Sequence, residues 1–362
     1  NTLDGFTATP NTNVNFPNKE VTMTVSVSNG RMVNTLLSDH VDINVDATAI
    51  VSKGNPICMM SLNPTAKEAL YLNGTADVVA DGCSIHVNSN NGEALRQVGS
   101  GTAAAESFCV NGNYAGSNYT PMPEKKCRKE EDPLEEYFND DWVNVDYSVC
   151  DFQSSDVFSG GDDVVLLEPG VYCGDLDIMA HKTVILQGNN ETEGDTDSLY
   201  IFVNGSIDIR GNGSLRNYHV VADGVTPDAA KTFPSETAIL FTGNNAGRLE
   251  VNGGADMVVK AKSTGPFAGI AVAQDPTSVP NQPHQIAGGG DVNIDGIVYF
   301  PTQPLDITGN GVIGNNADQF AILADIIEIN GTGQLEIRIG ADYQAAGLPE
   351  LPESAERVRL LD

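Results

Sequence analysis

The sequence predicts an all-β protein: a parallel β-helix, or solenoid, preceded by a small antiparallel β module. Three observations lead to this prediction. The 37 Gly and 18 Pro fit many short strands joined by tight turns. Apolar runs of a few residues alternate with Asn-Gly and Asp-Gly pairs, which tolerate the positive φ of a turn. A strand-and-turn pattern then recurs almost to the C-terminus, and no long helical pattern interrupts it.

Residues 1–54 contain two alternating patterns that predict the antiparallel module. Apolar residues occupy every second position, first from Val21 to Val27 and then from Val41 to Val51. A period of two marks strands with one buried face. Residues 1–12 are polar and are expected to form an arm or an edge segment. We therefore expect residues 1–54 to form a β module that leads into the main body.

Residues 55–345 are expected to form the body, because one pattern repeats along them. An apolar residue, any residue, a second apolar residue and then a turn occur in the segments LYLNGT (from 70), IDIRGNG (from 207), LEVNGG (from 249), LDITGNG (from 305) and IEINGTG (from 327). Leu305 and Ile327 are 22 positions apart, and Ile207 and Leu249 are 42 apart, close to two periods. A period of about 20 to 25 residues predicts a solenoid. A pair of β-sandwiches or jelly rolls is the alternative, since these folds also use short strands.

Residues 113–141 form an insertion in the body, rich in Pro, Lys and Glu. This insertion carries the best helix signal in the chain. Asp132 is the predicted N-cap, Pro133 the first helical residue and Glu135 the capping-box acid. Leu134 and Phe138 would share a face of this short helix. Residues 346–362 are expected to be a tail that ends in a short helix or a closing strand.

The six cysteines lie at 58, 83, 109, 127, 150 and 173, with no Cys-x-x-Cys pair. Their spacing suits loop-closing disulfides better than zinc or redox chemistry. Six cysteines allow about 15 connectivities, and we favour the sequential pairs Cys58 with Cys83, Cys109 with Cys127, and Cys150 with Cys173. The compartment should then be oxidising, which predicts an extracytoplasmic location.

The formal charge of −30 disfavours binding to bare nucleic acid or to an anionic membrane. A solvated acidic coat explains this charge without a specific ligand. The chain contains no run of about 18 apolar residues and does not begin with Met. We therefore expect neither a membrane span nor a signal peptide, and expect the chain to be a processed or truncated piece.

One acidic loop is a weak calcium candidate. Its oxygen-bearing residues alternate and include a glycine in sixth place, as in a calcium loop; they are Asn189, Glu191, Glu193, Asp195 and Asp197. The twelfth position, where a bidentate acid belongs, is Tyr200, so an ordinary acidic surface loop is the competing interpretation. No other cofactor is expected.

Two further patterns point away from catalysis. Gly309, Gly311 and Gly314 match a dinucleotide-binding Gly-x-Gly-x-x-Gly, but an apolar strand-like run follows them instead of a helix, so we interpret them as a turn. The five histidines are scattered without metal-binding spacing, and the chain has no Gly-x-Ser-x-Gly. We expect a protein that is not an enzyme.

Several segments together resemble the C-terminal region of TadG-like proteins, in the TadE/TadG family of the Flp (tight adherence) pilus system. The similar segments are ICMMSLNPTAKEALYLNGTADVVADGCSIHVNSNNGEAL from 57, Asp132-Pro133-Leu134, EPGVYCGDLDI from 168, GPFAGIAVAQDP from 265 and DGIVYFPTQPLDITG from 295. The resemblance implies an exported bacterial envelope protein, associated with pilus assembly or the cell surface, with paired cysteines and no catalytic residues. The family carries a membrane helix before the first strands, and we expect this form of the chain to depart from the family at that point.

Three functional hypotheses follow. The first is a non-enzymatic structural protein of a pilus or cell surface, a filament subunit, tip or adhesin, that associates with itself or with other surface subunits. The second is a β-helix that binds or cleaves glycans, for which convergent acidic residues and aromatic side chains would be needed. The third is a calcium-dependent surface binder.

Overall fold

The computed structural model describes residues 6–15, 20–29, 42–52, 54–142, 146–187, 199–218, 236–278, 282–314, 317–340, 351–352, 354 and 357–361. The chain divides into two compact units, described separately below. Unit 1 comprises Asn1–Gly54 with Glu353–Asp362, and unit 2, the body, comprises Asn55–Pro352. Both are built from β-strands, as the sequence predicts.

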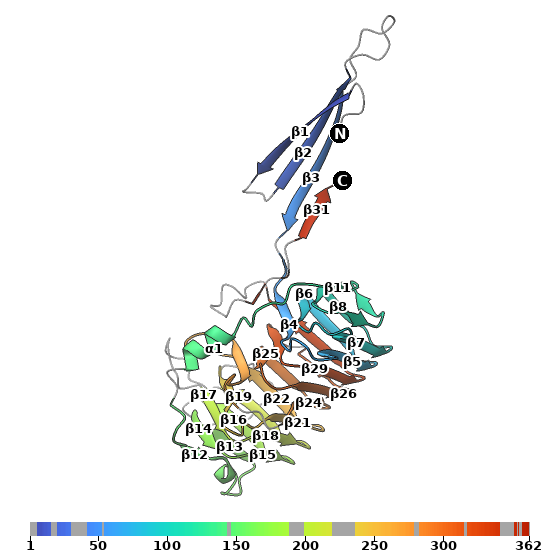
Figure 1. The fold of residues 1–362 in the computed structure, drawn as a ribbon. Coiled ribbons are helices and arrows are strands. Elements are labelled where there is room, and N and C mark those ends of the chain that lie inside the picture. The colour runs from blue at the N-terminus through green and yellow to red at the C-terminus, as the bar shows by residue number, and fades with distance from the viewer. Residues whose placement is uncertain are drawn as a thin grey trace, which may run out of the picture. The chain divides into compact units, whose positions relative to one another are not determined.

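Unit 1 is one antiparallel sheet with the strand order β1-β2-β3-β31 (Figure 1). Its strands are β1 (Phe6–Asn15), β2 (Glu20–Asn29), β3 (Asp42–Ser52) and β31 (Arg357–Leu361). In this sheet Val25 pairs with Val45, and Ile50 pairs with Arg359. The C-terminal tail therefore ends as a strand of the N-terminal sheet.

The body is a solenoid of parallel strands, which confirms the predicted β-helix. One side is a nine-stranded sheet in the order β15-β18-β21-β24-β26-β29-β5-β7-β9. The other strands form a larger sheet that covers two further sides. The 9 strands of the first sheet are β15 (Leu176–Met179), β18 (Ile207–Arg210), β21 (Leu249–Val251), β24 (His284–Gly288), β26 (Leu305–Gly309), β29 (Ile327–Gly331), β5 (Leu70–Gly74), β7 (Leu95–Gly99) and β9 (Tyr114–Ala115).

The larger sheet contributes the remaining strands of each coil. These are β4 (Ile57–Ser61), β6 (Asp77–Val87), β8 (Ala103–Val110), β10 (Tyr119–Thr120), β11 (Glu124–Lys125), β12 (Phe152–Gln153), β13 (Val164–Leu167), β14 (Gly170–Cys173), β16 (Thr183–Gln187), β17 (Leu199–Val203), β19 (Ser214–Tyr218), β20 (Ala238–Thr242), β22 (Asp256–Lys260), β23 (Ile270–Gln274), β25 (Val292–Phe300), β27 (Val312–Ile313), β28 (Phe320–Ala324) and β30 (Gln334–Arg338). A short 3-10 helix, η2 (Ser154–Asp156), follows β12.

Long strands of this sheet bend from one side of the solenoid to the next. In β25, Asp295 pairs with Lys260 on one side, and Ile297 pairs with Ile270 on the other. Gly296 lies between them with a φ of 139°, a conformation that residues with a Cβ rarely adopt. Glycine at this position therefore allows one continuous strand to turn the corner of the coil.

The order of the coils along the solenoid differs from their order along the chain. One end of the solenoid is formed by β12–β15, and the coils follow in chain order from there to β30. The strands β4–β11 then continue the stack beyond β30 (Figure 1). Ile322 of β28 pairs with Met59 of β4, and Ile327 of β29 pairs with Leu70 of β5. The first half of β6 pairs with β30 and its second half pairs with β4, so one coil combines β30 from late in the sequence with β4 and β5 from early in it.

The first and last residues of the body meet at this shared coil. The Ile57 amide donates a hydrogen bond of 2.8 Å to the Pro352 carbonyl oxygen. Both connections between the two units therefore leave the body at neighbouring positions. This arrangement accounts for the antiparallel pairing of β3 with β31 in unit 1, because the two strands enter that unit from adjacent points.

The structure corrects one part of the predicted repeat. Ile207 pairs directly with Leu249, so the 42 positions between them span one coil and not two. The next coil presents His284, which lies between Leu249 and Leu305 in the sheet order. Coil length varies because the connections between strands vary, whereas the strand that faces the core stays short and constant in pattern.

Columns of stacked apolar side chains fill the interior of the body. Along the nine-stranded sheet, the first inward position of each strand is apolar in most coils, and these side chains are almost fully buried: Leu176, Ile207, Leu249, Leu305, Ile327, Leu70 and Leu95. Each coil cannot bury this face alone, so neighbouring coils must stack to form the core.

The insertion forms the only helix of the body's described residues that is longer than one turn, α1 (Glu135–Trp142). It begins at Glu135, two residues after the predicted first residue, Pro133. Asp132 still caps this turn, because its Oδ1 accepts a hydrogen bond of 3.0 Å from the Leu134 amide. Leu134 and Phe138 are both fully buried. Among the described residues, no helix is long and apolar enough to span a membrane.

Candidate functional site

The structure contains the three disulfides Cys58–Cys83, Cys109–Cys127 and Cys150–Cys173. These are the pairs that the spacing favoured. The Cys58–Cys83 disulfide joins β4 to β6, which are strands of neighbouring coils. Both cysteines are fully buried. Three disulfides indicate an oxidising, extracytoplasmic environment.

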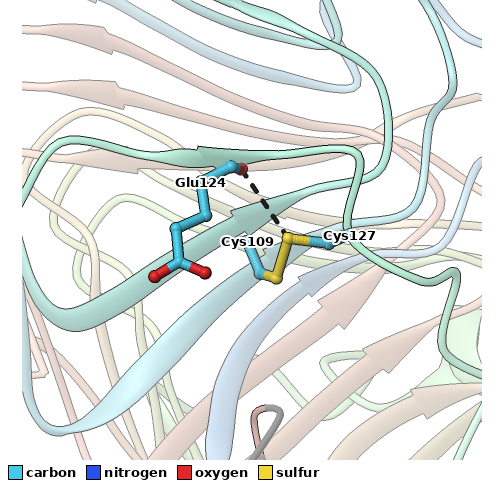
Figure 2. A group of neighbouring side chains, drawn as sticks. All are labelled: Cys109, Glu124 and Cys127. Atoms are coloured by element: carbon cyan, nitrogen blue, oxygen red, sulfur yellow. Dashed lines mark hydrogen bonds between the residues drawn. A yellow bond between two sulfur atoms is a disulfide. The ribbon is translucent and has the colours of Figure 1, made fainter. Parts of the chain in front are cut away.

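Cys109, Glu124 and Cys127 lie close enough together to resemble a metal site (Figure 2). Figure 2 shows, however, that the two sulfurs are bonded to each other, and a disulfide sulfur is not the thiolate that a metal needs. The Cys127 Sγ lies 3.7 Å from the Glu124 carbonyl oxygen. The disulfide therefore ties the segment that follows β11 to β8, and this group is structural.

The predicted calcium loop, with Asn189, Glu191, Glu193, Asp195 and Asp197, lies outside the described residues. The glycine motif lies within them. Gly309 ends β26 with a φ of 115°, and Gly314 follows β27 with a φ of 82°, so the motif forms turns between strands, as the sequence analysis interpreted it.

The most distinctive polar feature of the body is a column of acidic residues on the outer face of the nine-stranded sheet. Successive pairings place these residues in register across the strands, and we call them the acidic column: Asp177, Asp208, Glu250, Asp306 and Glu328. Gln285 occupies the same position between Glu250 and Asp306. Because neighbouring strands are about 4.8 Å apart, the directly paired acids, Asp177 with Asp208, Asp208 with Glu250 and Asp306 with Glu328, lie at short range.

The acidic column occupies the middle position of the apolar, any, apolar repeat. The sequence analysis treated this position as unspecified, although it holds an acid in LDI, IDI, LEV, LDI and IEI. The signal was therefore present in the sequence. Whether these acids form a column depends on the strand register, because the carboxylates lie together on one face only if neighbouring strands pair without a shift of one residue.

Two arginines neutralise part of the acidic column. Arg210 donates a hydrogen bond of 3.1 Å to the Asp208 Oδ2 and lies 3.7 Å from the Glu250 carboxylate. Arg248 is paired with Glu250 as well. The Asp208 Oδ1 is buried and has no hydrogen-bond partner among the described residues. Within the described part of the chain, Asp208 is therefore held at one carboxylate oxygen and unpaired at the other.

Burial and like charge raise the pKa values along the acidic column. Burial, with the neighbouring Glu250 charge, raises the pKa of Asp208 to about 6. Burial also raises the pKa of Asp306, and burial together with the Asp306 charge raises the pKa of Glu328. A carboxyl group with a pKa near 6 holds a proton in a mildly acidic medium and can donate it.

A cleft of about 620 Å³ lies beside α1 in the body. Its lining is acidic and includes Glu130, Glu131, Glu135 and Glu136, with Lys129 as its one base. Asn88 holds the backbone of the lining segment at Glu130. Its side-chain amide donates a hydrogen bond of 2.9 Å to the Glu130 carbonyl oxygen and accepts one of 2.9 Å from the Glu130 amide. The cleft and the acidic column are separate features, and their shared property is negative charge.

No family model matches the chain, and no curated protein is similar to it at a significant level.

Proposed function

We propose that this chain is a non-enzymatic structural protein of the cell surface or of a pilus, serving as a filament subunit, tip or adhesin. The observation that carries the proposal is the way the body is held together. Disulfides join neighbouring coils, and the shared coil of β30, β4 and β5 brings the first and last segments of the body into one stack. Such a body resists unravelling from either end of the chain, which suits a component exposed to mechanical load and proteases.

The two-unit organisation supports the same proposal. The body carries unit 1 through two adjacent connections, and unit 1 is a sheet of long strands with its own pairing. A sheet with its own strand pairing, separate from the solenoid, suits a part of the chain that contacts other subunits. The resemblance to TadG-like proteins, stated above from the sequence, points toward a pilus or envelope setting.

The test is to locate the protein in its cell. An epitope tag after Gly92, in an exposed turn of the body where a Cβ would meet nothing within 4 Å, should leave the fold intact. Immunogold labelling of intact cells should mark the surface or its appendages, and shearing should release the label. Label that appears only after the cells are permeabilised would contradict the proposal.

A second candidate, glycan binding or cleavage, is favoured by the acidic column alone. Asp208 and Glu250 lie in register on neighbouring strands, and the pKa of Asp208 is raised to about 6. Glycosidases use two carboxyl groups on facing positions, one of them with a raised pKa. Release of reducing sugar from a surface polysaccharide, lost in Asp208→Asn but kept in Asp306→Asn, would establish this candidate. No release from a broad polysaccharide panel would remove it.

A further inference from the structure

One side of the unit 1 sheet is exposed and apolar among the residues whose side chains are described. Met23 is 44% exposed and Val45 is 58% exposed. Val25, which pairs with Val45, lies beside Met23 on the same strand face and is partly exposed. Large apolar side chains that remain open to solvent on a neighbouring pair of strands indicate a contact surface.

Register extends this surface across the sheet. Directly paired residues of an antiparallel sheet share a side, and alternate residues of a strand do too. The positions that share a side with Met23 are the even-numbered positions of β1 and β31 and the odd-numbered positions of β2 and β3, and none of them holds a charged residue. We call these positions the Met23 side.

The charged residues of the described strands occupy the opposite positions. These are Glu20, Asp42, Asp46, Arg357 and Arg359. In a chain with a net charge of −30, an uncharged sheet side is unusual. It is also the kind of surface on which two copies of so acidic a chain can approach each other without charge repulsion.

The dimensions of the sheet fit a partner of the same kind. The unit 1 sheet consists of three strands of 10, 10 and 11 residues and a fourth strand of 5 residues. With strands about 4.8 Å apart and about 3.4 Å per residue, one side covers about 600 Å². Two such sides packed together bury about 1,200 Å², which reaches the size of a stable specific interface.

We propose that unit 1 is a dimerisation module, in which the Met23 sides of two copies of this chain pack face to face as a two-layered β-sandwich. A single sheet cannot enclose a hydrophobic core by itself, and a second sheet packed against it encloses the core between the two layers. The contact is isologous, so the same surface serves both copies and the assembly closes at two. This inference rests on the proposed structural function for its biological meaning, but its physical test does not depend on the cell.

Sedimentation velocity of the full chain tests the proposal, over concentrations from about 1 to 100 μM because dimer formation follows mass action. The wild type should convert from monomer to dimer. The double variant Met23→Lys/Val45→Lys should weaken the dimer by at least about 100-fold, because it buries charge in the interface. The matched variant Thr24→Lys/Ser26→Lys adds the same charge to the opposite side and should dimerise like the wild type.

A second measurement uses the unmodified protein and does not depend on how the variants fold. Peroxide should oxidise Met23 more slowly at high protein concentration, where the dimer covers it, than at low concentration. Any one of four results would overturn the proposal. The wild type could stay monomeric throughout, or both double variants could dissociate equally. The double variant at Met23 and Val45 could dimerise normally, or Met23 oxidation could be independent of protein concentration. A dimer found in a protein that is not on the cell surface would leave this inference standing and remove the proposed function.

Discussion

The Asn73 side chain donates a hydrogen bond of 3.1 Å to the Asn330 side chain, 257 positions later in the sequence. This bond crosses the seam where the early coils of the chain stack on the late ones. The turn glycines that follow these asparagines, Gly74 and Gly331, are also in register. The seam is therefore continuous with the rest of the ladder, and its turn geometry can be tested by substitution.

Gly74→Ala should destabilise the body at this seam. Gly74 has a φ of 100°, and a Cβ there would lie 2.4 Å from the Gly331 carbonyl oxygen. The backbone conformation alone costs a residue with a Cβ about 1 to 3 kcal/mol, and the overlap adds to that. Urea unfolding followed by circular dichroism measures the loss.

Gly92→Ala is the matched control for this substitution, because its Cβ would meet nothing within 4 Å and its φ is not positive. This variant should keep the midpoint of the wild type. Equal midpoints for Gly74→Ala and Gly92→Ala would show that the seam does not form as described.

The three disulfides should be reduced in an order set by burial. Cys58 and Cys83 are both fully buried, whereas Cys109 and Cys150 are partly exposed, so reductant reaches the latter first. Alkylation of native protein at intervals after adding dithiothreitol, followed by mass spectrometry, gives the order. Loss of Cys58–Cys83 before or together with the other two would contradict the burial of that bond.

Removing the buried bond should also lower stability. Cys58–Cys83 closes a loop of 25 positions, and a loop of this length contributes about 3 kcal/mol by restricting the unfolded chain. The variant Cys58→Ser/Cys83→Ser should unfold at a correspondingly lower urea concentration. An unchanged midpoint would mean that the stack holds these strands without the bond.

The acidic column should make stability fall as pH rises through the pKa of Asp208. That pKa is about 6 in the folded protein and 3.8 in an ordinary aspartate, so the folded state binds the proton more tightly. This contribution is present below pH 3.8 and is lost as pH rises to about 6. Asp208→Asn removes this contribution. The free energy of unfolding of the variant minus that of the wild type should therefore be higher at pH 7 than at pH 4, by about 1 kcal/mol after allowance for solvent screening.

Urea midpoints of the wild type and Asp208→Asn at pH 4 and pH 7 measure this difference. Asp81→Asn, at an exposed acid of β6 outside the acidic column, is the matched control for the loss of one carboxylate. If both variants respond to pH alike, the charges of the column do not interact as the register implies.

His284 should act in the opposite direction. It is fully buried in a column of leucines, where its Nδ1 accepts a hydrogen bond of 3.0 Å from the Leu249 amide and its Nε2 lies 2.7 Å from the Gln303 Oε1. Burial lowers its pKa from 6.5 to about 3, so the folded state stays neutral while the unfolded state gains a proton. Its contribution is therefore lost as pH falls from 6.5 toward 3.

His284→Leu tests this account of His284. It should be less stable than the wild type at pH 7, because the Leu249 amide loses its acceptor, at a cost of about 1 to 3 kcal/mol. It should also lose less stability than the wild type between pH 7 and pH 4. A variant with the same pH dependence as the wild type would show that His284 is charged, or is exposed, in the folded protein.

Much of the fold could be predicted from the sequence because solenoid coils repeat a local pattern. The apolar pairs at Leu305 with Ile307 and at Ile327 with Ile329 mark coils directly. The coil at His284 was missed because a histidine stands at an apolar position, and its burial depends on Gln303 and Leu249, which are not neighbours in the sequence.

The shared coil could not be predicted, because nothing local to Gln334–Arg338 or Ile57–Ser61 states that the two segments lie in one turn of the solenoid. That relationship depends on long-range pairing. The acidic column is similar: each acid was visible, but its partners are one coil away, and coil lengths that range from 19 to 42 positions hide the register.

The central claim is that this protein is a disulfide-bonded solenoid that works outside the cytoplasm as a structural element. The most direct measurement is the cysteine state of the protein recovered from sheared cell-surface material, alkylated at once and digested without reductant. The account predicts linked peptides for Cys58–Cys83, Cys109–Cys127 and Cys150–Cys173 in the sheared fraction. Protein found only inside the cells with its cysteines alkylated would contradict it.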